Sequence, residues 1–280
     1  MEQWLFPAIL TDKNDWLIKR YTSSHNLIKY IAAKEHLQEE AEILHQGTNL
    51  ICGFGNRILK IYAPESCGYQ ASEDFNREIS ALQQLWGTGL RVPHILNMGC
   101  VHDQYDFYYL ILEKLNILPA AQFVDTCTPK ELNQFGGKLL HSLDSFKKIT
   151  VDRNLAKTCS SQIFPERVKY LSKYRPRFVH ADLSGDNILY DGEHLAIIDF
   201  EDWTYNAPCV EYPALIFELL HGEQTAIQTF FARPLTQTFI DEIFDGLICH
   251  YNWERLVKRY CMIDPQILTS LEEARQRFEV

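Results

Sequence analysis

The chain has 280 residues, of which 46% are hydrophobic and 23% charged, a composition typical of an ordinary globular protein. Its formal net charge of −10 at pH 7 argues against a nucleic-acid-binding surface, because phosphate backbones require a basic footprint. No stretch approaches the roughly 20 apolar residues that a membrane-spanning helix requires. The length suits one large domain or two lobes that share a cleft.

The N-terminus and the cysteines indicate the compartment. The opening sequence, MEQWLFPAILTDKNDW, has an acidic second residue and an apolar run too short for a signal peptide. The eight cysteines are scattered, with no Cys-x-x-Cys and no zinc-like spacing, so we expect reduced thiols and a cytoplasmic protein.

The first forty residues are predicted to be mainly helical. Ser23 or Ser24 is placed to cap a helix, which would carry Leu27, Ile28, Ile31 and Ala32 on one face. Turn chemistry at 46–49 and 53–56 then divides the next stretch into three antiparallel strands, over 41–46, 49–53 and 57–62. We interpret Gly53 and Gly55 as turn residues.

Helix and strand signals continue toward the middle of the chain. Apolar residues at helical spacing predict a helix over 72–86, and two strands follow over 97–102 and 107–114. Thr128, Pro129 and Glu131 together form a capping box with proline at the first helical position, so a helix begins there.

A hairpin is predicted within residues 178–200. Asp191-Gly192 stands between two short apolar runs, which is a strong hairpin signal. Polar residues would then lie just before one strand and just after the other. Because residues 209–280 are predicted to be helical, the sequence indicates an α+β fold with a sheet-rich first part and a helix-rich second part.

The polar residues around this hairpin form a pattern suited to phosphoryl transfer. His180, Asp182, Leu183 and Asn187 spell H-x-D-L-x-x-x-N, and Asp199 follows in Ile-Ile-Asp-Phe. Phosphoryl transfer requires a metal on the phosphates, a lysine, and a carboxylate that orients the attacking hydroxyl. The short string alone is weak evidence, but Asp199 at the end of the hairpin makes it specific.

This segment resembles the catalytic loop and the metal-binding aspartate of the protein-kinase-like superfamily. The resemblance implies that Asp182 is the catalytic residue and that Asn187 and Asp199 hold Mg²⁺. It also implies that Lys60 binds the phosphates, with Glu78 on the following helix as its ion-pair partner. Glu73 and Asp74 precede Glu78 in that helix and are the alternatives.

Further parts of the nucleotide site follow from the same resemblance. The loop 46–49, with Gly47, Thr48 and Asn49, would cover the phosphates. Residues 113–115, with Glu113 and Leu115, would be the hinge whose backbone holds the purine of ATP or GTP. His180 is interpreted as a structural residue of the loop, and Asp186 as an exposed loop carboxylate.

Departures from protein kinases indicate a small-molecule kinase. Ala181 and Glu201 replace the arginine before the catalytic aspartate and the glycine after Asp-Phe. Helical pattern resumes by 211–220, which leaves no room for a peptide-docking activation segment. The chain is therefore similar to the aminoglycoside phosphotransferase and choline kinase-like family, and the Ala181 position favours the hygromycin B phosphotransferase branch.

One departure concerns the support of the catalytic loop. The family usually continues with Gly-Asp-Pro-x-x-Asp, whereas residues 206–211 of this chain read Asn-Ala-Pro-Cys-Val-Glu. The loss of Gly-Asp puts the hydrogen bonds that support the loop in doubt, but not the metal ligands.

The resemblance implies a protein-kinase-like fold of two lobes. Residues 1–114 would form a nucleotide-binding lobe with a five-stranded antiparallel sheet, and 115–280 a mainly helical catalytic and substrate-binding lobe. Glu201, Asp202 and Trp203 are the candidate residues for a small acceptor, which includes cationic ones such as an amino sugar; packing in the interior is the alternative for Trp203.

Other functions stay open at this point. The acceptor of the same chemistry is either an antibiotic or a metabolite such as choline, homoserine or a ketosamine, so the sequence does not separate antibiotic resistance from metabolism. A protein side chain as the acceptor is disfavoured by the short segment after Asp199. A kinase-shaped nucleotide-binding or partner-binding module without phosphotransfer is disfavoured because all the motif residues are present. The oligomeric state is not readable.

Overall fold

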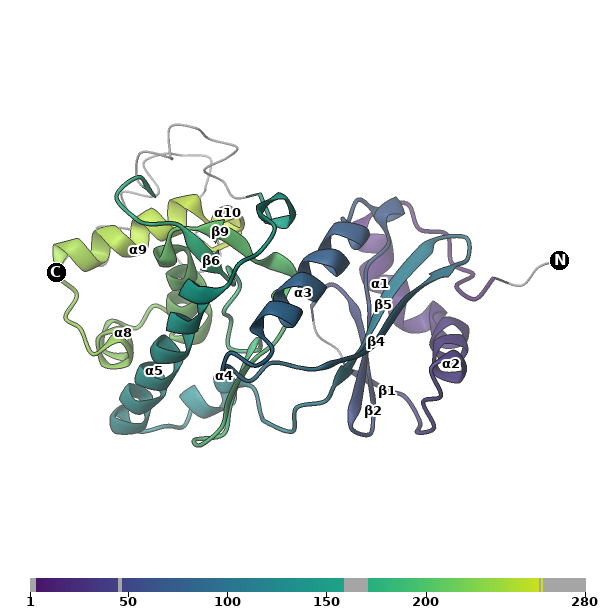
Figure 1. Cartoon of the computed structure of the whole chain (residues 1–280), viewed down its shortest axis with the longest axis horizontal. Coiled ribbons are helices and arrows are strands. Elements are labelled where there is room, and N and C mark those ends of the chain that lie inside the picture. Colours follow the sequence, from purple (N-terminus) through teal and green to yellow (C-terminus); the bar gives the residue numbers. More distant parts are fainter. Residues whose placement is uncertain (1–3, 45–46, 159–170, 257, 259–280) are drawn as a thin grey trace. The chain divides into compact units, whose positions relative to one another are not determined.

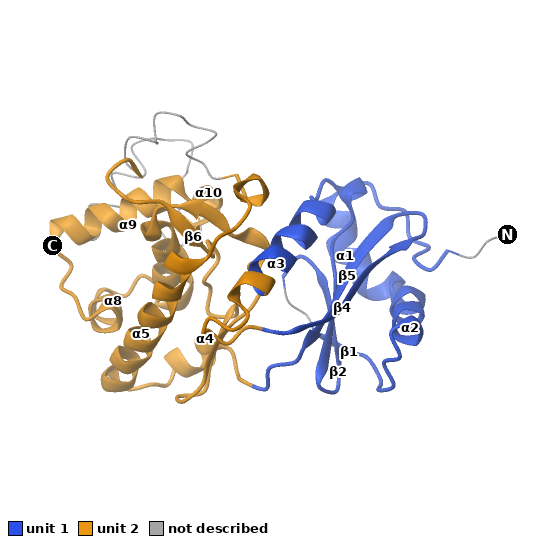
Figure 2. Ribbon diagram, in the orientation of Figure 1, with its two compact units in different colours: residues 1–82, 93–116 blue, residues 83–92, 117–280 orange. Residues whose placement is uncertain are grey.

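The computed structural model describes residues 4–44, 47–158, 171–256 and 258. The chain divides into two units, one of residues 1–82 and 93–116 and the other of residues 83–92 and 117–280 (Figure 2). The two units are described separately below.

The first unit is built on a five-stranded antiparallel sheet with the strand order β1-β2-β3-β5-β4. Helices accompany the sheet (Figure 1). The strands are β1 (Glu42–Leu44), β2 (Leu50–Phe54), β3 (Arg57–Ile61), β4 (Ile95–His102) and β5 (Asp106–Glu113), and the helices are α1 (Lys13–Ser23), α2 (His25–Lys34) and α3 (Ala71–Leu85).

The two faces of this sheet have different partners. Leu59 and Ile61 of β3 are fully buried in a core that also contains Trp16 of α1 and Leu27 of α2. Because side chains alternate along a strand, Lys60 lies on the opposite face, where it meets α3. The N-terminal helices are therefore part of the core of this unit, since they cover one face of the sheet.

The segment before α1 is fastened to the turn between β4 and β5. The backbone N–H groups of Leu5 and Phe6 donate to the carboxylate of Asp103, at 3.2 and 2.9 Å. The N–H of Leu10 donates to the hydroxyl of Tyr105 at 2.8 Å. Residues almost a hundred positions apart are thus held together.

The predicted elements of the first unit are present, with shifted boundaries. Residues 45 and 46, at the end of the first predicted strand, lie outside the described residues. Gly53 lies within β2 instead of in the turn, while Gly55, with φ 55°, is a turn residue as predicted. Ser24 precedes α2, but its side chain makes no capping hydrogen bond, so the expected serine cap was wrong.

Within its described residues, the second unit contains two small two-stranded sheets and several helices. Strand β6 (Arg177–Val179) pairs with β9 (Thr204–Asn206), and β7 (Ile188–Tyr190) pairs with β8 (Leu195–Ile197) as the predicted hairpin. The α-helices are α4 (Ala120–Val124), α5 (Pro129–Leu143), α8 (Gln224–Phe231), α9 (Gln237–Cys249) and α10 (Trp253–Leu256). The 3₁₀ and π segments are η2 (Asp144–Lys148), η3 (Arg153–Leu155), η5 (Phe200–Asp202), η6 (Pro208–Glu211) and η7 (Ala214–Leu219), and η1 (Glu65–Cys67) belongs to the first unit.

Local chemistry explains where α5 begins, and close backbone contact explains where α9 lies. Thr128 and Glu131 form the predicted capping box at the start of α5. A Cβ added to Gly246 of α9 would lie 2.0 Å from the carbonyl oxygen of Cys209 in η6. Only glycine permits this approach, so α9 packs directly on the backbone of η6.

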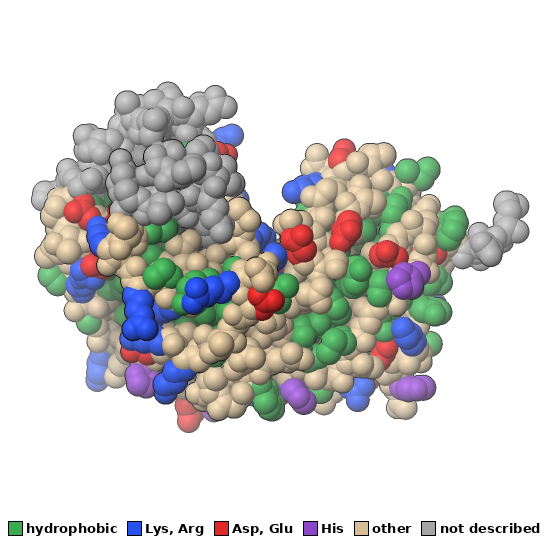
Figure 3. Space-filling model, turned by 45° about the horizontal axis from the view of Figure 1, so that its top comes forward, with side chains coloured by type: hydrophobic (Ala, Val, Ile, Leu, Met, Phe, Trp, Pro, Cys, Tyr) green, Lys and Arg blue, Asp and Glu red, His purple; other side chains and the backbone are tan. Residues whose placement is uncertain are grey.

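The architecture is the predicted α+β class, with a five-stranded antiparallel sheet and a mainly helical second part. Of the 209–280 region predicted to be helical, residues 257 and 259–280 lie outside the described part of the chain. Among the described helices, none combines the length and apolar character that crossing a membrane requires. Figure 3 shows charged side chains of both signs on the visible face of the molecule.

Candidate active site

The hairpin of the second unit brings the predicted catalytic and metal-binding residues to one place. Asp182 lies in the loop that follows β6, and Asn187 stands directly before β7. Asp199 follows β8, whose pairing with β7 returns the chain to the same end of the hairpin. The short strands thus fix polar residues that are 17 positions apart in sequence.

Asp182 and Asn187 are in direct contact. The Asn187 amide nitrogen donates to the Oδ2 atom of Asp182 and to its backbone carbonyl, both at 2.9 Å. Because the amide nitrogen is used in this way, the amide oxygen of Asn187 is turned away from Asp182. Asp199 has φ 64° and ψ 61°, a left-handed conformation that a residue other than glycine rarely adopts.

Buried acidic surroundings raise the pKa of Asp182 well above its usual value. Loss of hydration is the main cause, and the carboxylates of Asp202, Glu218 and Asp199 add to it. The guanidinium of Arg255 acts in the opposite direction. A carboxylate in such surroundings has a stronger tendency to take up a proton, which suits a general base.

His180 shapes the loop through both ring nitrogens. Its Nε2 atom lies 2.9 Å from the carbonyl oxygen of Ile198, and its Nδ1 atom lies 3.2 Å from the N–H of Asp182. This arrangement requires the tautomer with the proton on Nε2. The side chain is fully buried. Through its two hydrogen bonds the ring connects the catalytic loop to Ile198, the residue before Asp199.

Glu211 is a supporting residue whose role the sequence did not predict. Its carboxylate accepts the N–H of His180 at 2.6 Å and the N–H of Ala181 at 3.0 Å. The doubt about the loop's supporting hydrogen bonds is therefore corrected, because Glu211 provides them without Gly-Asp. Glu211 stands where the family motif has its final aspartate, but the motif does not reveal which backbone groups the carboxylate binds.

His250, on the segment after α9, holds the other side of the same loop residue. Its Nε2 atom donates to the carbonyl oxygen of Ala181 at 2.5 Å, and its Nδ1 atom accepts the N–H of Asn252. Ala181 has φ 66°, so a left-handed backbone is held from both sides, by Glu211 at its N–H and by His250 at its carbonyl. The sequence carried no signal for this histidine.

Burial shifts the pKa values of these two anchors in opposite directions. It raises the pKa of Glu211 to about 7 and lowers the pKa of His250 to about 4. A histidine that resists protonation when folded stabilises the protein above pH 6.5, and this contribution is lost as the pH falls from 6.5 toward 4. Glu211 acts oppositely, because the folded protein takes up its proton first as the pH falls from 7 toward 4.5.

The His250→Gln variant should therefore be less sensitive to acid than the wild type. Glutamine can still donate to the carbonyl of Ala181 but does not titrate. Relative to this variant, the wild type should lose about 2 kcal/mol of unfolding free energy between pH 7.5 and pH 5. Urea denaturation of both proteins at several pH values measures the difference, and parallel pH curves would contradict the assignment.

The three candidate acceptor residues have different surroundings. Trp203 is fully buried and its ring packs 5.2 Å from that of Phe178, so it is an interior residue and not a surface for an acceptor. Asp202 is bonded to Lys157 and accepts the hydroxyl of Tyr251 at 2.6 Å. Glu201 is partly buried beside it in η5.

In the first unit, Lys60 is paired with Glu78. Their Nζ and Oε2 atoms are 2.5 Å apart, and the Tyr62 hydroxyl donates to the same oxygen at 2.5 Å. The residues Lys60 and Glu78 are only 4% and 1% exposed. Glu73 and Asp74, the alternative partners, lie on the same helix as Arg77 and form ion pairs with it.

The predicted phosphate loop and hinge also lie in the first unit. Gly47 has φ 61°, and the Oδ1 atom of Asn49 accepts the N–H of Ala63 at 3.1 Å. The carbonyl oxygen of Thr48 accepts hydrogen bonds from α1. At the hinge, Glu113 ends β5 and Leu115 is buried.

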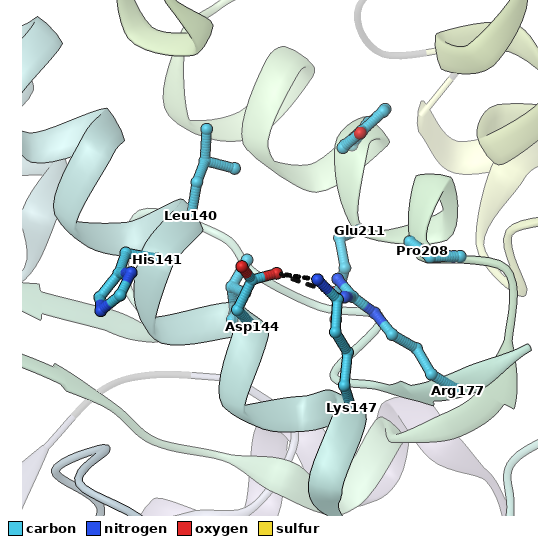
Figure 4. A pocket seen from close by; sticks show the side chains of 9 residues that line it. Leu140, His141, Asp144, Lys147, Arg177, Pro208 and Glu211 are labelled. Atoms are coloured by element: carbon cyan, nitrogen blue, oxygen red, sulfur yellow. Dashed lines mark ion pairs between the residues drawn. The ribbon is translucent and has the colours of Figure 1, made fainter.

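A separate hollow of about 460 Å³ lies in the second unit, and Glu211 is one of its lining residues (Figure 4). Asp144 lies in it with Lys147 at 2.6 Å and Arg177 at 3.9 Å. Its lining residues are Leu140, His141, Leu143, Asp144, Lys147, Arg177, Pro208, Glu211 and Tyr212. None of the predicted catalytic or metal-binding residues is among them.

Asn187 and Asp199 fit a divalent cation chemically. The amide oxygen of Asn187 faces away from Asp182, and Asp199 supplies a carboxylate. Amide and carboxylate oxygens are the hard ligands that Mg²⁺ prefers, usually together with water and phosphate oxygens.

Comparisons with known proteins identify a matching family and a shared fold. Residues 151–256 match the model of the phosphotransferase enzyme family known as APH, which confirms the resemblance for the segment that carries the motif. No curated protein sequence is significantly similar to the chain. The closer likeness to the hygromycin B branch stays a prediction.

Solved structures share the fold over most of the chain. The GDP complex of aminoglycoside 2'-phosphotransferase-IIIa has a TM-score of 0.62 at 16% identity, covering 90% of this chain and 98% of its own. The streptomycin–ATP complex of APH(2")-IIa has a TM-score of 0.59 at 13% identity, with coverages of 86% and 91%. Amicoumacin kinase with AMP-PNP, Ca²⁺ and Ami has a TM-score of 0.61 at 15% identity, with coverages of 91% and 96%. The chain therefore has the kinase-like fold of aminoglycoside phosphotransferases.

Proposed function

We propose that this chain is a small-molecule kinase that transfers the γ-phosphoryl group of ATP or GTP to a hydroxyl group. The observation that carries the proposal is the Asp182–Asn187 contact on a loop held by Glu211, His180 and His250, with Asp199 at the end of the same hairpin. Residues 1–114 would bind the nucleotide, and residues 115–280 would supply the catalytic residues and bind the acceptor.

The proposed step needs one proton acceptor and a well-positioned hydroxyl. The hydroxyl oxygen forms a bond with the γ-phosphorus, the bond between that phosphorus and the bridging β–γ oxygen breaks, and nucleoside diphosphate leaves. Asp182 orients the hydroxyl and accepts its proton, which its raised pKa favours. Lys60, fixed by Glu78 and Tyr62, would bind the phosphates.

Mg²⁺ bound by Asn187 and Asp199 would neutralise charge on the phosphates. The amide of Asn187 also fixes the orientation of the Asp182 carboxylate, so this residue would serve both the metal site and the catalytic residue.

The acceptor class follows from the charges near Asp182. Asp202 and Glu218 both raise the pKa of Asp182, and each has a basic partner, Lys157 and Arg255 respectively. With Asp182 and Asp199 the carboxylates outnumber these two cations, so the surroundings are acidic on balance. Such surroundings favour an acceptor that carries a positive charge, such as an amino sugar or another cationic alcohol. Glu201 and Asp202 are the proposed acceptor residues, and Trp203 supports them from the interior.

Release of nucleoside diphosphate from Mg-ATP and Mg-GTP tests this function directly. The purified protein would be assayed with aminocyclitol antibiotics, choline, homoserine and ketosamines as acceptors. Release that depends on one acceptor class, together with a phosphorylated product seen by mass spectrometry, is the expected result. Binding of nucleotide without transfer to any acceptor would instead favour a nucleotide-binding module.

A further inference from the structure

Helix α1 contacts the loop that is proposed to cover the nucleotide phosphates. The indole N–H of Trp16 donates to the carbonyl oxygen of Thr48 at 2.8 Å. The guanidinium of Arg20 donates to the same oxygen at 3.1 Å and to the carbonyl oxygen of Gly47 at 2.9 Å. Two consecutive peptide groups of the loop are thus held by one helix.

These contacts fix the direction of the loop's N–H groups. In a trans peptide the carbonyl and the following N–H point in opposite directions. Because the carbonyls of Gly47 and Thr48 point toward α1, the N–H groups of Thr48 and Asn49 point away from it. Consecutive backbone N–H groups are the donors that many phosphate-binding loops use.

Burial indicates that these contacts are specific. Arg20 is only 6% exposed, and within the described part of the chain it forms no ion pair with a carboxylate. A buried guanidinium is costly unless hydrogen bonds satisfy it. The two loop carbonyls and the Tyr21 hydroxyl, at 2.7 Å, are the partners of its two terminal nitrogens, while its Nε atom has none among the described residues. Trp16 is fully buried against Phe6 and Phe107, so its indole cannot turn away.

We propose that α1 is a positioning element for nucleotide binding, in which Trp16 and Arg20 orient the amides of Thr48 and Asn49 toward the phosphates. The inference rests on the proposed kinase function and adds two residues outside its motifs. The side chain of Asn49, bonded to Ala63, holds the loop at its other end. The loop is then preorganised before nucleotide arrives, which reduces the ordering cost of binding.

Trp16→Phe is the sharpest test, because it keeps an aromatic ring in the core and removes one hydrogen-bond donor. We expect faster amide hydrogen exchange at residues 48–50 in the nucleotide-free protein and a nucleotide KM about fivefold higher. The kcat and the acceptor KM should stay within about twofold, since the residue positions only the phosphate loop. Arg20→Lys, which keeps the charge but has fewer donors, should raise the nucleotide KM by about fivefold or more.

Tyr105→Phe is the matched control. It removes a hydrogen bond that holds the same N-terminal segment, at Leu10, without contacting the loop. Its exchange at 48–50 and its nucleotide KM should stay close to those of the wild type. Equal effects of Trp16→Phe and Tyr105→Phe, or faster exchange without a higher nucleotide KM, would overturn the positioning role.

Failure of the proposed function is distinguishable from failure of this inference. A wild-type chain that binds neither ATP nor GTP in a direct titration would overturn the kinase proposal and the nucleotide role of α1 together. The exchange measurement needs no nucleotide, so it still decides whether α1 holds the loop.

Discussion

The Asp182→Asn variant is expected to fold normally and to lose acceptor-dependent phosphotransfer by about 10²- to 10⁴-fold in kcat, the usual contribution of a general base. The asparagine oxygen can still accept the hydrogen bond from Asn187, so the loop should keep its geometry. It cannot accept the hydroxyl proton. Steady-state release of nucleoside diphosphate measures the loss.

Stability separates this explanation from simple damage to the loop. Asp182 is a partly buried carboxylate, and loss of hydration together with three other carboxylates, Asp202, Glu218 and Asp199, disfavours its charge. Removing its charge in metal-free buffer should raise the unfolding midpoint, as expected for a functional residue placed in unfavourable surroundings. Asp186→Asn, an exposed carboxylate of the same loop, should change neither quantity. A lower midpoint together with the lower kcat would mean that the loop had been disrupted.

Replacing Glu211 with alanine is expected to destabilise the second unit by about 2–5 kcal/mol, because two buried N–H groups lose their acceptor. These belong to His180 and Ala181, directly before Asp182. A catalytic group displaced by about 1 Å can lose about 10²-fold in rate. We therefore expect kcat to fall by about that factor, even at temperatures where the variant is folded.

Glu211→Gln is the matched control for this prediction. It keeps the volume of the side chain and one acceptor oxygen, but its amide NH₂ would face the second N–H. Its loss of stability should be less than that of the alanine variant. Denaturant unfolding and kcat, measured on all three proteins, provide the comparison. A stable, fully active Glu211→Ala protein would show that the loop does not depend on this carboxylate.

Local signals made much of the fold predictable. The capping box of Thr128 and Glu131 and the turn at Asp191-Gly192 depend on residues that are neighbours in sequence. The hairpin in turn placed Asn187 and Asp199 at the same end, so the second-unit part of the site could be anticipated. Strands β6 and β9 have three residues each, which is too short for a periodic pattern.

The supporting contacts could not be predicted, for a different reason. Glu211 and His250 form hydrogen bonds with backbone groups of the loop. Every residue has such backbone groups, so the residue types in the sequence do not show which of them will be bound. Arg20 likewise binds carbonyl oxygens instead of a carboxylate, so no complementary charge marked its partner. The sequence left both an acceptor role and interior packing open for Trp203, because an aromatic residue next to polar motif residues is compatible with an exposed and with an interior position.

The contact of the N-terminal segment with Asp103 and Tyr105 constrains how the chain is made. Phe6 and its carboxylate partner are 97 residues apart, so helices α1 and α2 leave the ribosome long before strand β5 does. Until β5 is available, the apolar face that buries Trp16 has only part of its cover. Contacts of this range are slow to form, and exposed apolar surface favours aggregation in the meantime. The first unit therefore needs residues 103–113 to complete its core. A translational pause before these residues would prolong the exposure of the apolar surface and lower the yield of folded protein.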